Sequence, residues 1–201
     1  MGIGAALAAG SLGYYLYERS TEQPRYRLIT KDGDFEVRTY PKMLVAEVIT
    51  SGEREEALNS GFRKLAGYIF AKSRGGEKIA MTAPVLQDRE PLSMTAPVLQ
   101  SGAGEKLWRT RFIMPAGRTP SDLPSPPADI HIEEIGPRNI AAVRFSGRAS
   151  DLAIAEHAAR LTEWMSRQSL KAGGDAVYAF YNSPFIPPFL RRNEILIPVG
   201  N

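Results

Sequence analysis

The stretch FEVRTYPKMLVAEVITSG, residues 35–52, has a counterpart later in the chain, IHIEEIGPRNIAAVRFSG, residues 130–147. The two stretches align without a gap, share identical residues at several positions and keep apolar residues at others. Each reads as two short strands joined by a turn and ended by Ser-Gly. A repeat with only two copies predicts a pseudo-twofold, duplicated unit and excludes a solenoid.

The sequence after each copy has the spacing of an amphipathic helix, over about 53–71 and 151–170. Gly75-Gly76 ends the first helical pattern and Gly173-Gly174 ends the second. Further strands are expected at 26–30, 107–114, 177–181 and 195–199, with an extended segment at 79–86. The pattern predicts an α+β fold whose two halves meet over a shared cleft, a favoured place for a ligand.

Apolar and charged residues alternate within 107–114, which is typical of a strand. Trp108 and Phe112 fall on one face of this strand, and Arg109 and Arg111 fall on the opposite face. The alternation predicts a strand with an apolar face and a charged face.

A second, shorter repeat has MTAPVLQ at 81–87 and again, letter for letter, at 94–100. The two copies predict extended arms that form a hairpin-like lip. Because each proline removes a donor from a sheet ladder, edge positions are favoured. The apolar, proline-rich loop PFIPPFL at 184–190 is a second candidate for a binding lip.

Composition excludes several classes of protein. The 201 residues carry a formal net charge of +3, with no Lys/Arg run and interleaved aromatic residues of the kind that binds nucleic acid. No cysteine is present, which excludes disulfides and thiolate ligands. Motifs of serine hydrolases, zinc enzymes and phosphate-binding loops are missing, so the sequence predicts a binding protein and not an enzyme.

Residues 1–17, MGIGAALAAGSLGYYLY, contain no charged side chain. This predicts a membrane tether or export signal in an N-terminal segment 1–24, ahead of a folded domain over 25–201. We therefore expect a membrane-tethered or exported protein. A buried N-terminal helix in a cytoplasmic protein is the alternative, and the oligomeric state is left open.

Only two histidines occur, His131 and His157. His131 lies between two isoleucines on an expected strand, so its side chain is predicted to face solvent. His157 borders the apolar stripe of the second helix and is predicted to be structural. We do not expect either residue to be a metal ligand.

Several segments in order resemble the SOUL haem-binding family. The resemblance covers about 26–199 and is carried by FEVRTYPKMLVAEV (35–48), EKIAMTAPVLQ (77–87), WRTRFIMP (108–115), YNSP (181–184) and RRNEILI (191–197). It implies a distorted antiparallel β-barrel flanked by two long helices.

The resemblance also implies that the chain binds haem or another small-molecule tetrapyrrole in an apolar pocket, as a carrier, buffer or sensor. One branch of the family has an axial histidine between the Arg and Tyr of a triplet that here reads Arg38-Thr39-Tyr40, so binding by contact is expected, without strong axial ligation. The site residues that the resemblance implies are Asn59, Phe62, Arg63, Ala66, Met81, Tyr181 and Phe185.

Two other functions remain compatible with this sequence. The fold could bind another flat hydrophobic small molecule and have no role with haem. Alternatively, the protein could modify tetrapyrroles as an enzyme, although no residue is singled out for catalysis.

Overall fold

The computed structural model describes residues 16, 18, 20–73, 76–90 and 106–200. Within these residues the predicted α+β pattern is confirmed as one sheet with two long helices. The strands are β1 (Arg27–Asp32), β2 (Phe35–Tyr40), β3 (Met43–Ser51), β4 (Val85–Arg89), β5 (Leu107–Ile113), β6 (His131–Ile135), β7 (Arg138–Phe145), β8 (Val177–Phe180) and β9 (Asn193–Pro198). The helices are α2 (Arg54–Ile69) and α3 (Asp151–Arg167), with short 3₁₀ turns η1 (Pro120–Asp122) and η2 (Pro188–Leu190).

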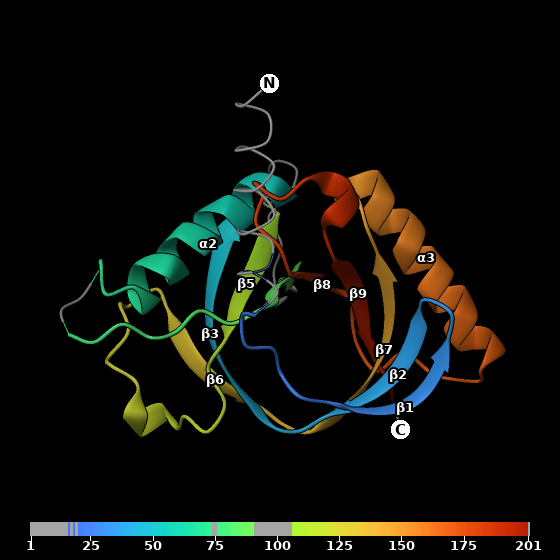
Figure 1. Cartoon of the computed structure of the whole chain (residues 1–201), viewed down its shortest axis with the longest axis horizontal. Coiled ribbons are helices and arrows are strands. Elements are labelled where there is room, and N and C mark those ends of the chain that lie inside the picture. Colours follow the sequence, from blue (N-terminus) through green and yellow to red (C-terminus); the bar gives the residue numbers. More distant parts are fainter. Residues whose placement is uncertain (1–15, 17, 19, 74–75, 91–105, 201) are drawn as a thin grey trace, which may run out of the picture.

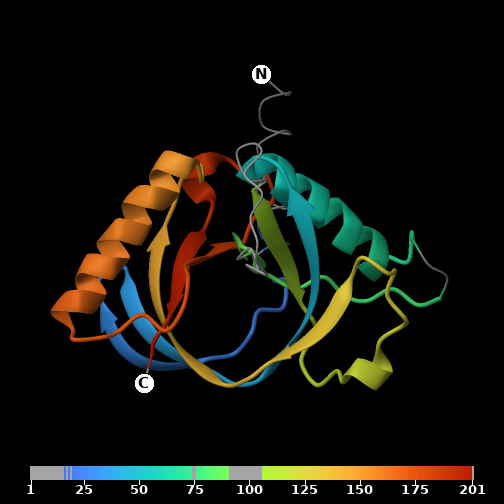
Figure 2. The same ribbon diagram turned by 180° about the vertical axis from the view of Figure 1, so that it is seen from behind.

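All strand pairs in the sheet are antiparallel, in the order β1-β2-β7-β9-β8-β4-β5-β3-β6. The sheet curls into a trough, and the two helices lie on its outer side (Figure 1). The view from behind shows the same arrangement (Figure 2). Helix α2 packs on β3 and β5, whereas α3 packs on β7 and β9.

The prediction of an antiparallel sheet flanked by two long helices is confirmed, but the distorted β-barrel is wrong, because the sheet is open. β1 and β6 are its two edge strands, and they do not pair with each other. β1 is exposed along its whole length, and β6 presents the charged residues Glu133 and Glu134. Exposed, charged edge strands resist pairing with a further strand, which is a physical reason for the sheet to stay open.

Side chains alternate between the concave face of the trough and the helix-covered outer face. Val45 and Ile113 belong to the apolar cluster on the concave face. Their neighbours Ala46 and Phe112 belong to the cluster under α2, and a third cluster lies under α3. The sheet therefore separates two candidate binding surfaces, one on the concave face and one on the outer face that carries the helices.

The prediction that the proline of the first MTAPVLQ copy places it at an edge is wrong. β4 lies in the middle of the sheet, between β8 and β5. Pro84 comes directly before β4, so its missing N–H removes no donor from the ladder. The second copy, at 94–100, lies outside the described residues.

The described part of the N-terminal segment is attached to the domain. The Glu22 carbonyl accepts a hydrogen bond from the Ala83 N–H at 2.8 Å, and Pro24 lines a pocket on the concave face. No helix among the described residues is long and apolar enough to cross a membrane.

Candidate functional site

Four of the sequence-predicted site residues share one stripe of α2. Asn59, Phe62, Arg63 and Ala66 follow each other at helical spacing, so they occupy neighbouring positions on the same side. Asn59, Phe62 and Arg63 also line a shallow depression on the protein surface, together with side chains from the end of β3 and the first turns of α2. The structure therefore brings these three residues together.

Phe62 is the apolar part of this depression. Its ring remains 39% exposed and meets the buried ring of Phe112 edge-on, with centroids 5.3 Å apart. Arg63 is exposed and makes no hydrogen bond or ion pair with any described residue. By contrast, the Lys64 ammonium pairs with Asp129 at 2.8 Å.

The orientation of α2 explains why Phe62 faces outward. The residues buried against the sheet include Ala57, Gly61, Leu65 and Tyr68. Gly61 comes so close to β5 that a Cβ atom placed on it would lie 2.5 Å from the Thr110 Oγ1 atom. This close approach fixes the rotation of the helix and turns Phe62 and Arg63 away from the core.

The other predicted site residues lie elsewhere. Met81 and Ala66 pack, partly buried, against the apolar cluster under α2. Tyr181 is buried on the concave face of the sheet, and Phe185 is 84% exposed on the loop after β8. The structure thus does not bring Tyr181 together with the α2 stripe, because the sheet lies between them.

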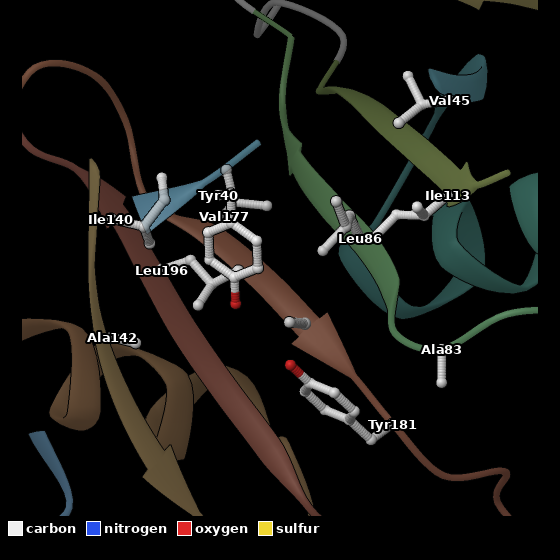
Figure 3. Packing of buried hydrophobic residues seen from close by; sticks show 11 residues of the cluster. Tyr40, Val45, Ala83, Leu86, Ile113, Ile140, Ala142, Val177, Tyr181 and Leu196 are labelled. Carbon is white, nitrogen blue, oxygen red and sulfur yellow. The ribbon is translucent and has the colours of Figure 1, made fainter. Parts of the chain in front are cut away.

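The concave face has a pocket of its own. Its space free of atoms is about 410 Å³, including a part open to solvent, and the enclosed part holds about one water molecule. Side chains from β2, β4, β7 and β8, and from the residue directly after β8, extend into the trough: Tyr40, Leu86, Ile140, Val177 and Tyr181 (Figure 3). Side chains therefore nearly fill the shared cleft that the sequence predicted between the two halves.

A buried charge network lies on this concave face. The Glu194 carboxylate accepts hydrogen bonds from the Arg38 guanidinium at 2.6 and 3.0 Å, from Arg192 at 2.7 Å and from the Tyr181 hydroxyl at 2.9 Å. Burial raises the pKa of Glu194, but the hydrogen bonds and charges of the two arginines outweigh it and hold the pKa below its usual value. Glu194 is thus a structural anion, already fully paired.

Arg138 is the charged side chain that lines the concave pocket. Its buried Nε atom has no hydrogen-bond partner, and its guanidinium forms no ion pair with any described residue. Burial, together with the nearby charge of Arg111, lowers the pKa of Arg138. The pocket therefore combines an apolar lining with one cation that has no ion-pair partner among the described residues, although the charge of Asp88 acts on it.

Neither histidine is placed to hold a metal at the α2 stripe. His131 lies on the exposed edge strand β6, as the sequence predicted. The His157 ring stacks on Phe145 at 4.1 Å, and its Nδ1 atom is 2.7 Å from the Ala153 carbonyl. No cluster of three His, Cys, Asp or Glu side chains able to hold a metal occurs in the described part of the chain.

Sequence comparison identifies the family. A family model described as "SOUL heme-binding protein" matches residues 21–198. The chain belongs to the SOUL family. Human "Heme-binding protein 2" is similar to this SOUL chain, with 30% identity over 195 residues that cover 95% of this chain and 86% of the human protein.

Solved structures share the fold of this SOUL domain at low sequence identity. The EcmrR C-terminal domain matches with a TM-score of 0.57 and 12% identity, covering 88% of this chain and 98% of that domain. A hydrolase from Listeria innocua matches with a TM-score of 0.55 and 12% identity, covering 85% of this chain and 94% of the hydrolase. At such identities the likeness concerns the fold alone.

Proposed function

We propose that this SOUL protein binds haem or a closely related tetrapyrrole on the outer face of α2. The observation that carries the proposal is the depression where the half-exposed ring of Phe62 lies beside the unpaired guanidinium of Arg63. Membership of the SOUL family and the similarity to human Heme-binding protein 2 support this choice of ligand.

The chemistry of the depression suits such a ligand. A tetrapyrrole offers a wide apolar face, which the Phe62 ring would cover, and carboxylates, which Arg63 would pair with. Removing one aromatic side chain from water contributes about 1.5–3 kcal/mol. Asn59, which also lines the depression, can donate and accept hydrogen bonds at its margin.

We expect the ring system to be held by contact and not by a protein–iron bond. His157 lies on α3 and stacks on Phe145, and His131 lies on β6, so neither residue is on α2. Met81, the nearest soft ligand in the sequence-predicted set, is partly buried in the cluster under α2. Iron-free protoporphyrin should therefore bind nearly as well as hemin.

An open surface site suits a protein that takes up and releases its ligand. The depression is shallow, so a ligand can leave without a large movement of the protein. A carrier or buffer needs such exchange, and we favour these roles over that of an enzyme. A titration of the full chain with hemin, followed by the shift of the Soret band, tests the proposal: a saturable shift is expected, and its absence would refute binding.

The concave pocket suggests a second candidate function. Its apolar lining and the Arg138 side chain, whose Nε atom has no hydrogen-bond partner, would suit a small hydrophobic anion, provided that side chains such as Met43 move aside. A thermal-shift screen of hydrophobic carboxylates would test this function. Stabilisation that disappears in Arg138→Gln but persists in Arg63→Gln would favour the concave pocket over the α2 site.

We also infer that the two halves of the domain derive from one duplicated unit. The first half would contain β2, β3, α2, β4 and β5, and the second half would contain β6, β7, α3, β8 and β9. Exchanging the corresponding strands β2 and β6, β3 and β7, β4 and β8, and β5 and β9 reverses the strand order and keeps every pair of neighbours; only the edge strand β1 has no counterpart. This symmetry supports the duplication that the repeated sequence predicts.

A further inference from the structure

One end of the molecule carries several exposed apolar side chains, which we call the apolar rim. The rim consists of Leu16, Leu152, Phe185, Phe189 and Leu190. Phe185, Phe189 and Leu152 are 84%, 75% and 80% exposed. Exposed apolar groups that gather in one place mark a surface for a partner or a membrane, whereas isolated ones need no explanation.

Contacts within the domain place these residues at the same end. Arg54, at the start of α2, forms an ion pair with Asp151, the first residue of α3. The Gly147 N–H, shortly before α3, donates to the Pro188 carbonyl of η2 at 2.9 Å. Figure 1 and Figure 2 accordingly show η2 beside the start of α3.

The loop that carries the two phenylalanines is built to hold its shape. The Arg191 guanidinium donates to the Ile186 carbonyl at 2.7 Å and to the Pro184 carbonyl at 2.6 Å. Ile186 is buried, so it anchors the middle of the loop in the domain. Phe185 and Phe189 flank this anchor in the sequence, and both side chains are exposed to water and do not pack into the core.

The chain reaches the N-terminal segment at the same rim. The Glu18 carboxylate accepts hydrogen bonds from the Ser183 N–H at 3.2 Å and from the Asn182 Nδ2 atom at 3.1 Å. Leu16, two residues earlier, is exposed. Glu18, the residue that follows the uncharged sequence 1–17, therefore lies directly beside the loop that presents Phe185.

The apolar rim also carries an exposed positive charge. Arg148 follows Gly147 and is exposed, and it forms no ion pair with any described residue. The Asp151 carboxylate is neutralised by Arg54. The Glu18 carboxylate is bound by neutral donors and keeps its negative charge, but the Arg191 guanidinium, which donates to carbonyl oxygens, offsets it and leaves Arg148 in excess. A free cation beside apolar side chains favours a surface that is both apolar and anionic.

We propose that the apolar rim docks on a lipid bilayer, with Phe185, Phe189 and Leu152 entering the interface and Arg148 facing anionic head groups. The uncharged sequence 1–17 and the rim would then be two separate membrane-binding elements of the same protein. A single weak signal gives only reversible binding, and two together give stable attachment.

Vesicle sedimentation of the full chain compares the rim with another pair of exposed apolar residues, Leu28 and Ile29 on β1. With vesicles of phosphatidylcholine and phosphatidylglycerol, the double variant Phe185→Ser/Phe189→Ser should bind about tenfold or more weakly than the unchanged protein. The control Leu28→Ser/Ile29→Ser removes two exposed apolar residues from β1 and should bind normally. Equal binding of all three proteins would overturn the proposal.

A fluorescent reporter at the rim identifies the occupant. Trp108 and Trp164 are buried, so a tryptophan introduced by Phe189→Trp reports its own surroundings. Its emission should shift to shorter wavelength when these vesicles are added, whereas emission from Leu28→Trp should not. If the emission of Phe189→Trp is already blue-shifted without vesicles, protein covers the rim. A shift that grows with protein concentration would indicate a second copy of the chain, and a shift that does not would indicate the N-terminal segment. Either result contradicts a bilayer as the occupant.

Discussion

Arg38 and Glu194 form a buried, bidentate ion pair between residues that are 156 positions apart in the sequence. Arg38 lies on β2 and Glu194 on β9, and these strands are separated by β7. The pair therefore crosses over β7 on the concave face of the sheet. It links the N-terminal and C-terminal parts of the domain at a place where no backbone ladder does so.

Removing the carboxylate charge of this pair should destabilise the domain strongly. Glu194→Gln removes the bidentate partner of the Arg38 guanidinium, which is almost fully buried and keeps only the Glu36 carboxylate, at 2.7 Å, as a counter-charge. Breaking a buried pair costs about 3–5 kcal/mol of unfolding free energy when the remaining charge is uncompensated, so with Glu36 still present we expect a loss of about 3 kcal/mol. Urea denaturation measures the loss. Glu163→Gln removes one partner of an exposed pair with Arg167 and should change stability by less than about 0.5 kcal/mol.

The same carboxylate gives stability a dependence on acid pH. The folded state holds the pKa of Glu194 below its ordinary value of 4.5, so the unfolded chain binds protons more readily. The contribution of Glu194 is therefore complete above pH 4.5 and is lost as the pH falls through the folded pKa. Unfolding free energies measured from pH 7 downward should fall less steeply below pH 4.5 in Glu194→Gln. An unchanged slope would show that Glu194 is not the group responsible.

Two glycines of α2 should respond in opposite directions to the same substitution. At Gly61 a Cβ atom would lie 2.5 and 2.7 Å from Thr110 atoms, so Gly61→Ala should cost about 1–3 kcal/mol by forcing α2 away from β5. At Gly67 the nearest atom would be the Ser73 Oγ at 3.6 Å, an ordinary contact. Gly67→Ala should therefore stabilise the protein by about 0.5–1 kcal/mol through helix propensity. Thermal unfolding of both variants measures the difference.

Arg63 should contribute to ligand binding without contributing to stability. Because its guanidinium is exposed and pairs with no described residue, Arg63→Glu should leave the unfolding free energy within about 0.5 kcal/mol of its original value. The dissociation constant for protoporphyrin should rise about tenfold, since the ligand carboxylates lose a cation and meet an anion. A matched charge reversal at the exposed residue Arg144, which lies on β7 and not on α2, should leave binding unchanged.

The alternation of polar and apolar residues was sufficient to predict the elements, but not the environment of their polar faces. Arg109 and Arg111 were correctly predicted to lie opposite Phe112 on β5. They are nevertheless largely buried, because the sheet curls and the carboxylate of Asp88 on β4 pairs with both guanidinium groups. Curvature and cross-strand pairing are properties of the whole sheet, which a pattern along one strand does not contain.

The candidate site was predictable only in part, for a similar reason. The family resemblance implied Asn59, Phe62, Arg63 and Ala66 as site residues, and the structure has these four on one stripe of α2. The same resemblance implied Tyr181, which lies across the sheet on the concave face. The close approach of Gly61 to Thr110 decides which way α2 turns, and nothing in the spacing of apolar residues reveals that contact.

The central claim is that the α2 stripe holds a tetrapyrrole by contact with its ring. It is tested most directly by titrating hemin and protoporphyrin, in parallel, into the unchanged protein, Phe62→Asp and Phe185→Asp, with thermal unfolding to confirm that each variant is folded. We expect both pigments to bind the unchanged protein and Phe185→Asp with similar affinity, and to bind Phe62→Asp about tenfold or more weakly. Undiminished binding of both pigments to a folded Phe62→Asp protein would contradict the account.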